Sequence, residues 1–204
     1  MAPEETLYEV GDTLNQAYFI VSGAVSLLST TSQGESVEVA MVGREGVIGI
    51  PSLLRNRATP YSVRVQIGGQ ALKVRAEVLR AEVKRGGELQ DLLLSYTHVL
   101  VRQIAQSTSC GMFHSTEQRL ARWLLASQDH ARSETLALTH ESISLALGVS
   151  RSGISTAAGV LQKKGLIRYA RGRITVLNRQ GLEATACECY QIIAEELGGF
   201  PGRV

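Results

Sequence analysis

Long apolar runs and cysteines are scarce in this sequence of 204 residues. No apolar run approaches the roughly 20 residues that a membrane-spanning helix needs, and residues 1–20 lack the basic and then apolar pattern of a signal peptide. The three cysteines, Cys110, Cys187 and Cys189, are too few and too scattered for a disulfide framework. These absences predict a globular protein of the reducing cytoplasm, with no membrane partner.

Motifs of the common enzyme classes are also missing. The chain has no GxSxG, no P-loop, no HExxH and no paired zinc-ligand spacing. Cys187-Glu188-Cys189 is a weak metal-binding pattern, because no second Cys/His pair is near it in sequence and such side chains diverge by about 200° on a helix. We therefore predict that the protein is not an enzyme and has no metal site.

Residues 138–163 have the pattern of two short helices joined by a tight turn. Thr139 can cap the first helix, and Gly148 suits the turn because a residue without Cβ adopts positive φ at little cost. Ser150 can cap the second helix, whose inward face is predicted to contain Ile154, Ala157, Ala158 and Leu161. This arrangement is typical of a helix-turn-helix.

The outward residues of the second helix suit the reading of DNA bases. An arginine in the first turn can donate two hydrogen bonds to guanine, and short hydroxyl side chains reach bases or phosphates. We predict base contacts by Arg151, Ser152, Ser155 and Thr156, with Arg151 as the main one.

Basic residues are concentrated around this motif and the segment after it. Residues 166–169 and 174–177 are predicted strands of a hairpin, or wing, with its basic tip at 170–173. Residues 139–180 carry a charge of +6, whereas the whole chain carries only +2, so a phosphate backbone is the expected partner; a merely solvated basic surface is the alternative. Predicted backbone contacts are Thr139, Ser150, Arg171 and Arg173.

Two stretches resemble a known DNA-binding domain. LGVSR at the turn and KKGLI before the wing are similar to the cyclic-AMP receptor protein/FNR (CRP/FNR) family of bacterial transcription regulators. The resemblance implies a homodimer on a palindromic operator in double-stranded DNA, with His140 at a phosphate-contact position and RNA polymerase as an open further partner. The family usually has Glu and a second Arg where this chain has Ser152 and Thr156, so base preference beyond Arg151 stays open.

The N-terminal half has the pattern of short β-strands. Apolar alternation broken by glycines over residues 6–75 predicts a small antiparallel barrel, and YFIVSGAVSLL and GREGVIG resemble the family's β-roll of the cyclic-nucleotide-binding type. The predicted fold class is α+β, with an antiparallel β-roll, a long dimerisation helix and a C-terminal winged helix-turn-helix. The expected domains are 1–86 for the β-roll, 87–114 for the dimerisation helix and hinge, and 115–204 for the DNA-binding domain.

The effector region departs from the nucleotide-binding members that the chain resembles. Those have a Gly-Glu pair and then Arg-Ser, whereas here Ile50 follows Gly49 and Thr59-Pro60 stands near the Arg-Ser position. Arg57 or Arg64 could substitute in a shifted register, although Arg64 fits a solvent-facing strand position better. The weak candidate pocket is therefore Gly49, Ile50, Thr59 and Arg64.

We expect none of the family's usual cofactors. The pocket pattern argues against a cyclic nucleotide, the missing N-terminal thiols argue against an FNR-type iron–sulfur cluster, and the single histidines argue against haem. The effector is left open. The alternatives are a constitutive or partner-controlled protein with a vestigial sensor domain, or a true cyclic-nucleotide-responsive regulator with a divergent pocket.

A long helix is predicted over residues 88–114. Its heptad positions predict a dimer seam of Leu89, Leu92, Tyr96, Val99, Gln103 and Gln106, whereas Leu93, Leu100 and Ile104 form a second stripe that could face the roll. The alternative is a core helix within one monomer. Further along, residues 118–127 predict a helix with Trp123 packed inward, and 178–197 a C-terminal helix unless Gly181 splits it.

Overall fold

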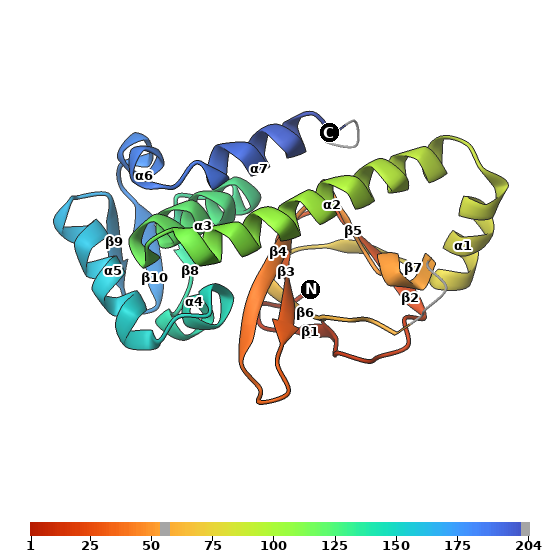
Figure 1. Ribbon diagram of the computed structural model, residues 1–204, viewed down its shortest axis with the longest axis horizontal. Helices are drawn as coiled ribbons and strands as arrows, with labels where there is room; N and C mark the ends of the chain where they lie inside the picture. Colours follow the sequence, from red (N-terminus) through yellow and green to blue (C-terminus); the bar gives the residue numbers. More distant parts are fainter. Residues whose placement is uncertain (54–57, 201–204) are drawn as a thin grey trace.

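The computed structural model describes residues 1–53 and 58–200 of the chain. A β-roll in the N-terminal half lies beside a helical C-terminal half, and the long helix α2 (Glu88–Phe113) runs along both (Figure 1). The predicted α+β class is confirmed. In the part of the chain that the structure describes, no helix combines the length and the apolar character of a membrane span.

Short alternating strands form the two sheets of the β-roll. One sheet has the order β1-β6-β3-β4 and the other β5-β2-β7. Inward side chains of both sheets, among them Val25, Val65 and Ile48, share one core, which is why the alternation predicted strands. Gly34, with φ +89°, lies in the turn between β3 and β4. The strands are β1 (Thr6–Tyr8), β2 (Gln16–Ile20), β3 (Ala24–Thr30), β4 (Ser36–Val42), β5 (Val47–Ile48), β6 (Ser62–Ile67) and β7 (Ala71–Arg75).

Two helices follow the roll, and the second lies where the sequence predicted a long helix. Helix α1 (Ala76–Arg85) ends at Gly86, and α2 ends with His114 as its C-cap. The predicted roll-facing stripe is confirmed, because Leu93 and Leu100 are buried in the roll core and Ile104 packs against it.

The predicted dimer seam on α2 is wrong for its central residues. Tyr96 and Val99 are only 4% and 7% exposed, because they pack in the core of their own chain. Leu89 is also partly buried there, and among the apolar residues of the predicted seam only Leu92 is exposed. The apolar heptad pattern therefore reflects contacts within one chain, as the alternative interpretation of this helix held.

The polar seam residues also face their own chain. Gln103 donates to the Met41 carbonyl oxygen at 2.9 Å, and Gln106 donates to the Cys189 sulfur at 3.0 Å. The C-terminal helix α7 (Cys189–Gly198) packs along this side of α2, as Figure 1 shows.

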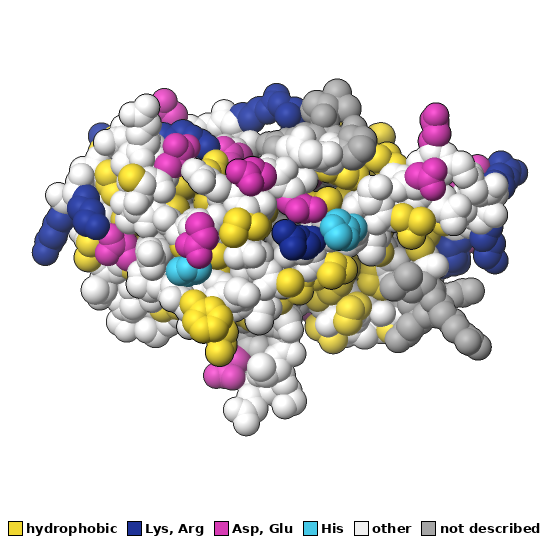
Figure 2. Space-filling view, turned by 45° about the horizontal axis from the view of Figure 1, so that its top comes forward, with side chains coloured by type: hydrophobic (Ala, Val, Ile, Leu, Met, Phe, Trp, Pro, Cys, Tyr) yellow, Lys and Arg dark blue, Asp and Glu magenta, His cyan; other side chains and the backbone are white. Residues whose placement is uncertain are grey.

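A different stripe of α2 is exposed. Leu94, Val101 and Met112 are 61%, 60% and 76% exposed. Successive residues of a helix are about 100° apart around its axis, so these three residues and Ala105 lie within about 40° of one another. This stripe lies about 160° around the helix from the predicted seam. Figure 2 shows separate hydrophobic side chains among polar ones along the middle of the molecule, where α2 runs.

The C-terminal half consists of helices packed on a small sheet. Its elements are α3 (Thr116–Ala131), β8 (Thr135–Ala137), α4 (His140–Leu147), α5 (Arg151–Lys163), β9 (Ile167–Ala170) and β10 (Arg173–Val176). Trp123 is 1% exposed, as predicted, in a core that it shares with Leu124, Ile143 and Ile154. Helix α3 is longer than predicted. Strand β8 was not predicted, because three residues are too few to show an alternation of apolar and polar side chains.

The C-terminal segment contains two helices rather than one. Helix α6 (Arg179–Thr185) ends at Ala186, whose φ of −65° and ψ of 156° are extended, and α7 begins at Cys189. Gly181 lies inside α6, where a Cβ would come within 2.5 Å of Leu166, so it permits close packing and does not split the helix. The break at 186–188 invalidates the argument that Cys187 and Cys189 diverge on a continuous helix.

Candidate nucleic-acid interface

The turn of the helix-turn-helix is held by three predicted residues. The Thr139 hydroxyl accepts a hydrogen bond from the Ser142 N–H at 3.0 Å and caps α4. Gly148 ends α4 with φ +59°, a left-handed conformation that favours glycine. The Ser150 hydroxyl accepts from the Gly153 N–H at 3.2 Å and caps α5. The sequence prediction of this turn is confirmed.

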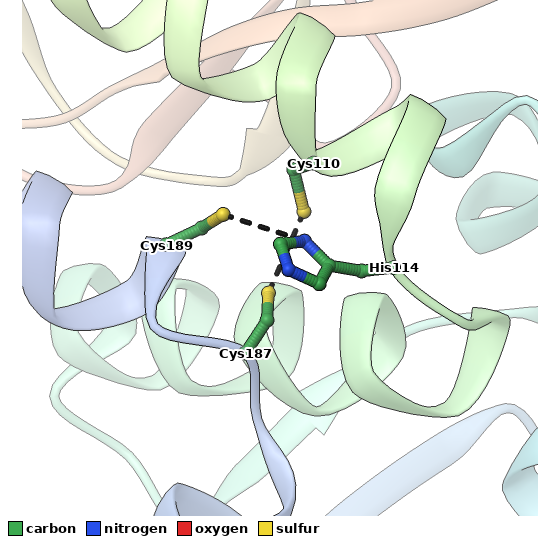
Figure 3. Close-up of side chains that lie close together, drawn as sticks. All are labelled: Cys110, His114, Cys187 and Cys189. Carbon is green, nitrogen blue, oxygen red and sulfur yellow. Dashed lines mark hydrogen bonds between the residues drawn. The ribbon is translucent and has the colours of Figure 1, made fainter.

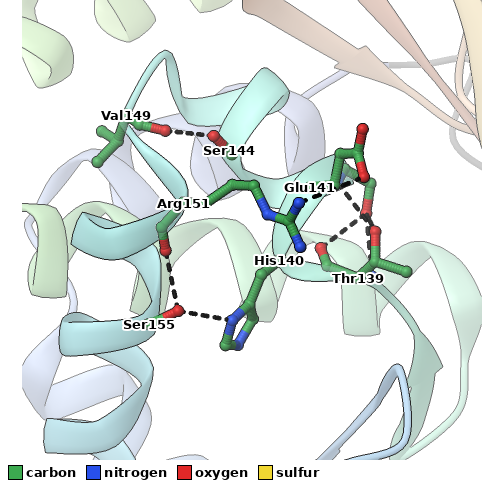
Figure 4. A network of polar contacts seen from close by, with 8 residues as sticks. Thr139, His140, Glu141, Ser144, Val149, Arg151 and Ser155 are labelled. Atoms are coloured by element: carbon green, nitrogen blue, oxygen red, sulfur yellow. Dashed lines mark hydrogen bonds and ion pairs between the residues drawn. The ribbon is translucent and has the colours of Figure 1, made fainter.

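Arg151 is the first residue of α5, and its side chain reaches toward Glu141 of α4 (Figure 4). Its side chain is 70% exposed, and its Nη1 lies 3.9 Å from Oε2 of Glu141, which is 78% exposed. An exposed pair at this distance is weak. The guanidinium can therefore leave Glu141 for a stronger acceptor. Ile154, on the opposite face of α5, is fully buried and anchors the helix.

Hydroxyl groups line the exposed face of α5 beyond Arg151. The Ser155 hydroxyl donates to the Arg151 carbonyl at 2.9 Å, and the Thr156 hydroxyl donates to the Ser152 carbonyl at 3.0 Å. Because their protons face the helix backbone, the oxygens present lone pairs that accept hydrogen bonds from base amino groups.

His140 lies between three elements of the motif. Its Nδ1 is 2.9 Å from the Ser155 hydroxyl, and its ring stacks on Tyr169 of β9 with the centroids 4.1 Å apart. Burial and the neighbouring Arg151 guanidinium lower the pKa of His140, which favours the neutral ring. This geometry fits a role for His140 in positioning Ser155. It fits less well with a cationic side chain that binds phosphate.

The wing is a tight hairpin with a basic tip. Arg171 and Gly172 join β9 to β10, and both have positive φ, 49° and 73°. The strands start and end one residue away from the predicted bounds of 166–169 and 174–177. Arg171 and Arg173 are both exposed, so their charges face solvent beside α5.

Two cations of the basic segment are paired away from this face. The Lys164 ammonium lies 2.5 Å from Glu117, and the Arg179 guanidinium lies 2.9 Å from Asp129. The positive surface is therefore smaller than the +6 of the sequence. Its exposed cations are Arg151, Lys163, Arg168, Arg171 and Arg173.

The residues predicted for an effector pocket make contacts within the described part of the roll. Ile50 is 6% exposed in the roll core, and Thr59 is 2% exposed with its hydroxyl donating to the Tyr61 carbonyl at 2.7 Å. Gly49 has φ +105°, and a Cβ at this position would lie 2.9 Å from the Gln16 carbonyl oxygen of β2. The Arg64 guanidinium lies 3.7 Å from the Glu4 carboxylate. Arg57, the other candidate, lies outside the described residues.

A partly buried polar contact that the sequence did not predict joins the roll to the C-terminal half. The indole N–H of Trp123 donates to one Glu38 carboxylate oxygen at 3.0 Å, and the Ser26 hydroxyl donates to the other at 2.5 Å. Both Glu38 and Trp123 line a cavity of about 40 Å³ between β4, α2, α3 and α7. Burial raises the pKa of Glu38 to about 7, against the opposing effects of the two hydrogen bonds and of Arg122.

Known protein families match both halves of the chain. Residues 1–85 match the cyclic nucleotide-binding domain, and residues 118–185 match the Crp-like helix-turn-helix domain. Among curated relatives, the global nitrogen regulator of Synechococcus elongatus is 26% identical over 85% of this chain and 82% of its own length. The anaerobic regulatory protein of Haemophilus influenzae is 24% identical over 87% of this chain and 72% of its own length.

Solved structures share the fold. FixK2 from Bradyrhizobium japonicum superposes with a TM-score of 0.76 at 20% identity, covering 91% of this chain and 94% of its own. TTHB099, a CRP-family transcriptional regulator from Thermus thermophilus, gives 0.75 at 20% identity over 91% and 95%. Because the two family matches cover the roll and the helix-turn-helix in this order, the chain belongs to the CRP/FNR family of transcription regulators and carries a helix-turn-helix DNA-binding domain.

Proposed function

We propose that the protein is a homodimer that reads a palindromic DNA site with Arg151 and answers to a signal other than cyclic AMP. The observation that carries the proposal is the exposed guanidinium of Arg151 at the start of α5, beside the basic wing. In a helix-turn-helix, the first turn of the second helix enters the major groove, where a bidentate arginine distinguishes guanine from other bases.

The remaining interface residues have supporting roles in this proposal. Ser155 and Thr156 accept hydrogen bonds from base edges near Arg151, and Ser152 accepts or donates there. Thr139, Ser150, Arg171 and Arg173 contact the phosphate backbone and fix the register. We assign His140 the positioning of Ser155, because its ring is stacked and its pKa is lowered.

Arg151→Ala tests the base contact. It should weaken binding to a selected site by about 1–3 kcal/mol, with relaxed preference at one position per half-site, because a bidentate contact to guanine is lost. The matched control is Lys163→Ala, an exposed cation of the same helix, which should weaken cognate and random duplexes equally. Equal losses on both duplexes for Arg151→Ala would make Arg151 a phosphate contact and contradict the proposal.

We place the second copy of the chain on the exposed stripe of α2. Leu94, Val101 and Met112 form an apolar face on the helix that links the roll to the DNA-binding half, and a two-fold protein presents α5 to two successive major grooves. Val101→Glu should give a monomer in light scattering, because it buries a charge at the seam. Ser95→Glu, on another exposed side of α2, should stay dimeric. A dimeric Val101→Glu variant would contradict this placement.

The residues near the usual nucleotide site support control by another signal. Ile50 and Thr59 occupy the positions where the family's phosphate-binding residues are expected, and both side chains are buried in contacts of the roll itself. A buried phosphate needs a fixed cationic donor. Selection of binding sites from random duplexes, with and without cyclic AMP and cyclic GMP, tests this point. A palindrome recovered only with a nucleotide would overturn it, whereas one recovered without nucleotide supports another signal or constitutive binding.

A further inference from the structure

Four metal-binding side chains from distant parts of the chain converge at the hinge. Cys110 and His114 lie at the C-terminal end of α2, Cys187 lies in the break between α6 and α7, and Cys189 is the first residue of α7. Their ligand atoms all lie within 4.8 Å of one another, and Figure 3 shows the four side chains pointing toward a common centre. We propose that these residues bind one Zn²⁺ ion with tetrahedral Cys₃His coordination.

The local backbone explains why the four side chains meet. Cys110 and His114 are four positions apart, so they lie on the same side of α2. Ala186 is extended and α7 starts only at Cys189, so the two cysteines of the C-terminal pair do not follow helical spacing and can face the same point. The three sulfurs are buried, with exposed fractions of 1%, 4% and 0%.

The distances fit a single ion. Zinc–sulfur bonds of about 2.3 Å and zinc–nitrogen bonds of 2.0–2.1 Å in a tetrahedron separate two sulfurs by about 3.8 Å, and a sulfur from a nitrogen by about 3.6 Å. In this structure, Sγ of Cys110 and Sγ of Cys187 are 3.6 Å apart, and Sγ of Cys189 is 3.6 Å from Nδ1 of His114. An iron–sulfur cluster inserts several atoms between its thiolates and requires donors that lie farther apart.

The groups around the donors complete the arrangement. Nε2 of His114 lies 3.2 Å from the Glu188 carboxylate, which leaves Nδ1 as the ligand atom and orients the ring. The Gln106 side chain donates to the Cys189 sulfur at 3.0 Å. A carboxylate on the outer nitrogen of a histidine and an N–H donor on a thiolate are the usual supports of a zinc ligand set.

Thiolate and imidazole donors also match the chemistry of Zn²⁺. Soft sulfur ligands with one imidazole in a closed tetrahedral set are typical of structural zinc sites. Zinc bound here ties the end of α2 to the start of α7, across the boundary between the long helix and the DNA-binding half.

The test is zinc binding by the full-length protein purified under reducing, oxygen-free conditions. Elemental analysis should find about one zinc per chain, and Co²⁺ in its place should give the visible bands of a tetrahedral ion and the near-ultraviolet thiolate-to-cobalt band. This readout needs no DNA, so its failure is distinguishable from a failure of the DNA-binding proposal.

Three variants locate the site. Cys187→Ser should lose the zinc and the thiolate-to-cobalt band, with circular dichroism as the check on its fold. Glu188→Gln keeps all four ligands and should weaken zinc affinity by roughly 10- to 100-fold in a chelator competition. Glu195→Gln, an exposed carboxylate of the same helix α7, is the matched control and should bind as the unaltered protein does.

Several results would overturn the proposal. They are a folded, reduced protein that takes up neither Zn²⁺ nor Co²⁺, a Cys187→Ser variant with unchanged zinc content, or equal affinities for Glu188→Gln and the unaltered protein. A Cys110–Cys187 disulfide in metal-free protein after reducing purification would also refute it and would assign the cluster to thiol redox chemistry.

Discussion

The Glu38 carboxyl should make the folded protein less stable as the pH rises through neutrality. Its pKa is about 7 in the folded protein against an ordinary value of 4.5, because burial between β4 and α3 disfavours the carboxylate. The folded state therefore holds this proton more tightly than the unfolded state does. The resulting stability is fully present below about pH 4.5 and is lost as the pH rises through about 7.

The size of the effect follows from the two pKa values. Each pKa unit corresponds to about 1.4 kcal/mol, so the free energy of unfolding should fall by about 3 kcal/mol across this window. Glu38→Gln cannot ionise and keeps an acceptor for the Trp123 indole N–H. It should resemble the unaltered protein at low pH and exceed its stability by up to about 3 kcal/mol above neutrality.

Urea unfolding at several pH values between about 4 and 8.5 measures this difference, and the fluorescence of the single tryptophan, Trp123, monitors the same contact. Glu35→Gln, an exposed carboxylate on the same hairpin, is the matched control. His130, whose ring lies 3.7 Å from Glu45 and lines the same cavity, is tested separately with His130→Gln. A stability gap between Glu38→Gln and the unaltered protein that stays constant with pH would refute the reasoning.

Three further substitutions test the DNA-binding half. Ile154→Ala removes a fully buried side chain and should lower the free energy of unfolding by about 2–5 kcal/mol in urea titrations; a loss below 1 kcal/mol would mean that α5 is not anchored there. Gly148→Ala should cost about 1–2 kcal/mol in the same assay, because φ is +59° and a Cβ would lie 3.2 Å from Val37; unchanged stability would contradict the left-handed turn. Arg171→Ala should reduce the slope of log affinity against log salt by about one on any duplex, and an unchanged slope would remove the wing from the phosphate contacts.

Local chemistry was enough to predict the helix-turn-helix. Thr139, Gly148 and Ser150 act on the backbone within three residues of themselves, so their capping and turning roles are visible in the sequence. The roll strands were likewise predicted from short apolar segments between glycine turns, although β3 is buried on both faces from Ala24 to Leu28 and does not alternate there.

The sequence could not decide which partner each apolar or polar face would meet. The heptad positions of α2 are apolar, yet whether Tyr96 and Val99 face a second chain or their own roll depends on where α7 lies. Glu38 and Trp123 are 85 residues apart, and only the packing of two domains brings them into contact. The periodicity of apolar residues in the sequence does not predict such a contact.

The cysteine cluster has the same explanation. The C-x₃-H spacing of Cys110 and His114 was present in the sequence as a helical pair, and it could have been matched with Cys187 and Cys189. Local reasoning rejected the second pair because it assumed one continuous helix. The sequence by itself determined the turns, caps and buried faces, because these depend on neighbouring residues. Only the tertiary structure decided which distant side chains share a site. The break at 186–188 and the packing of α7 on α2 set the positions of those side chains.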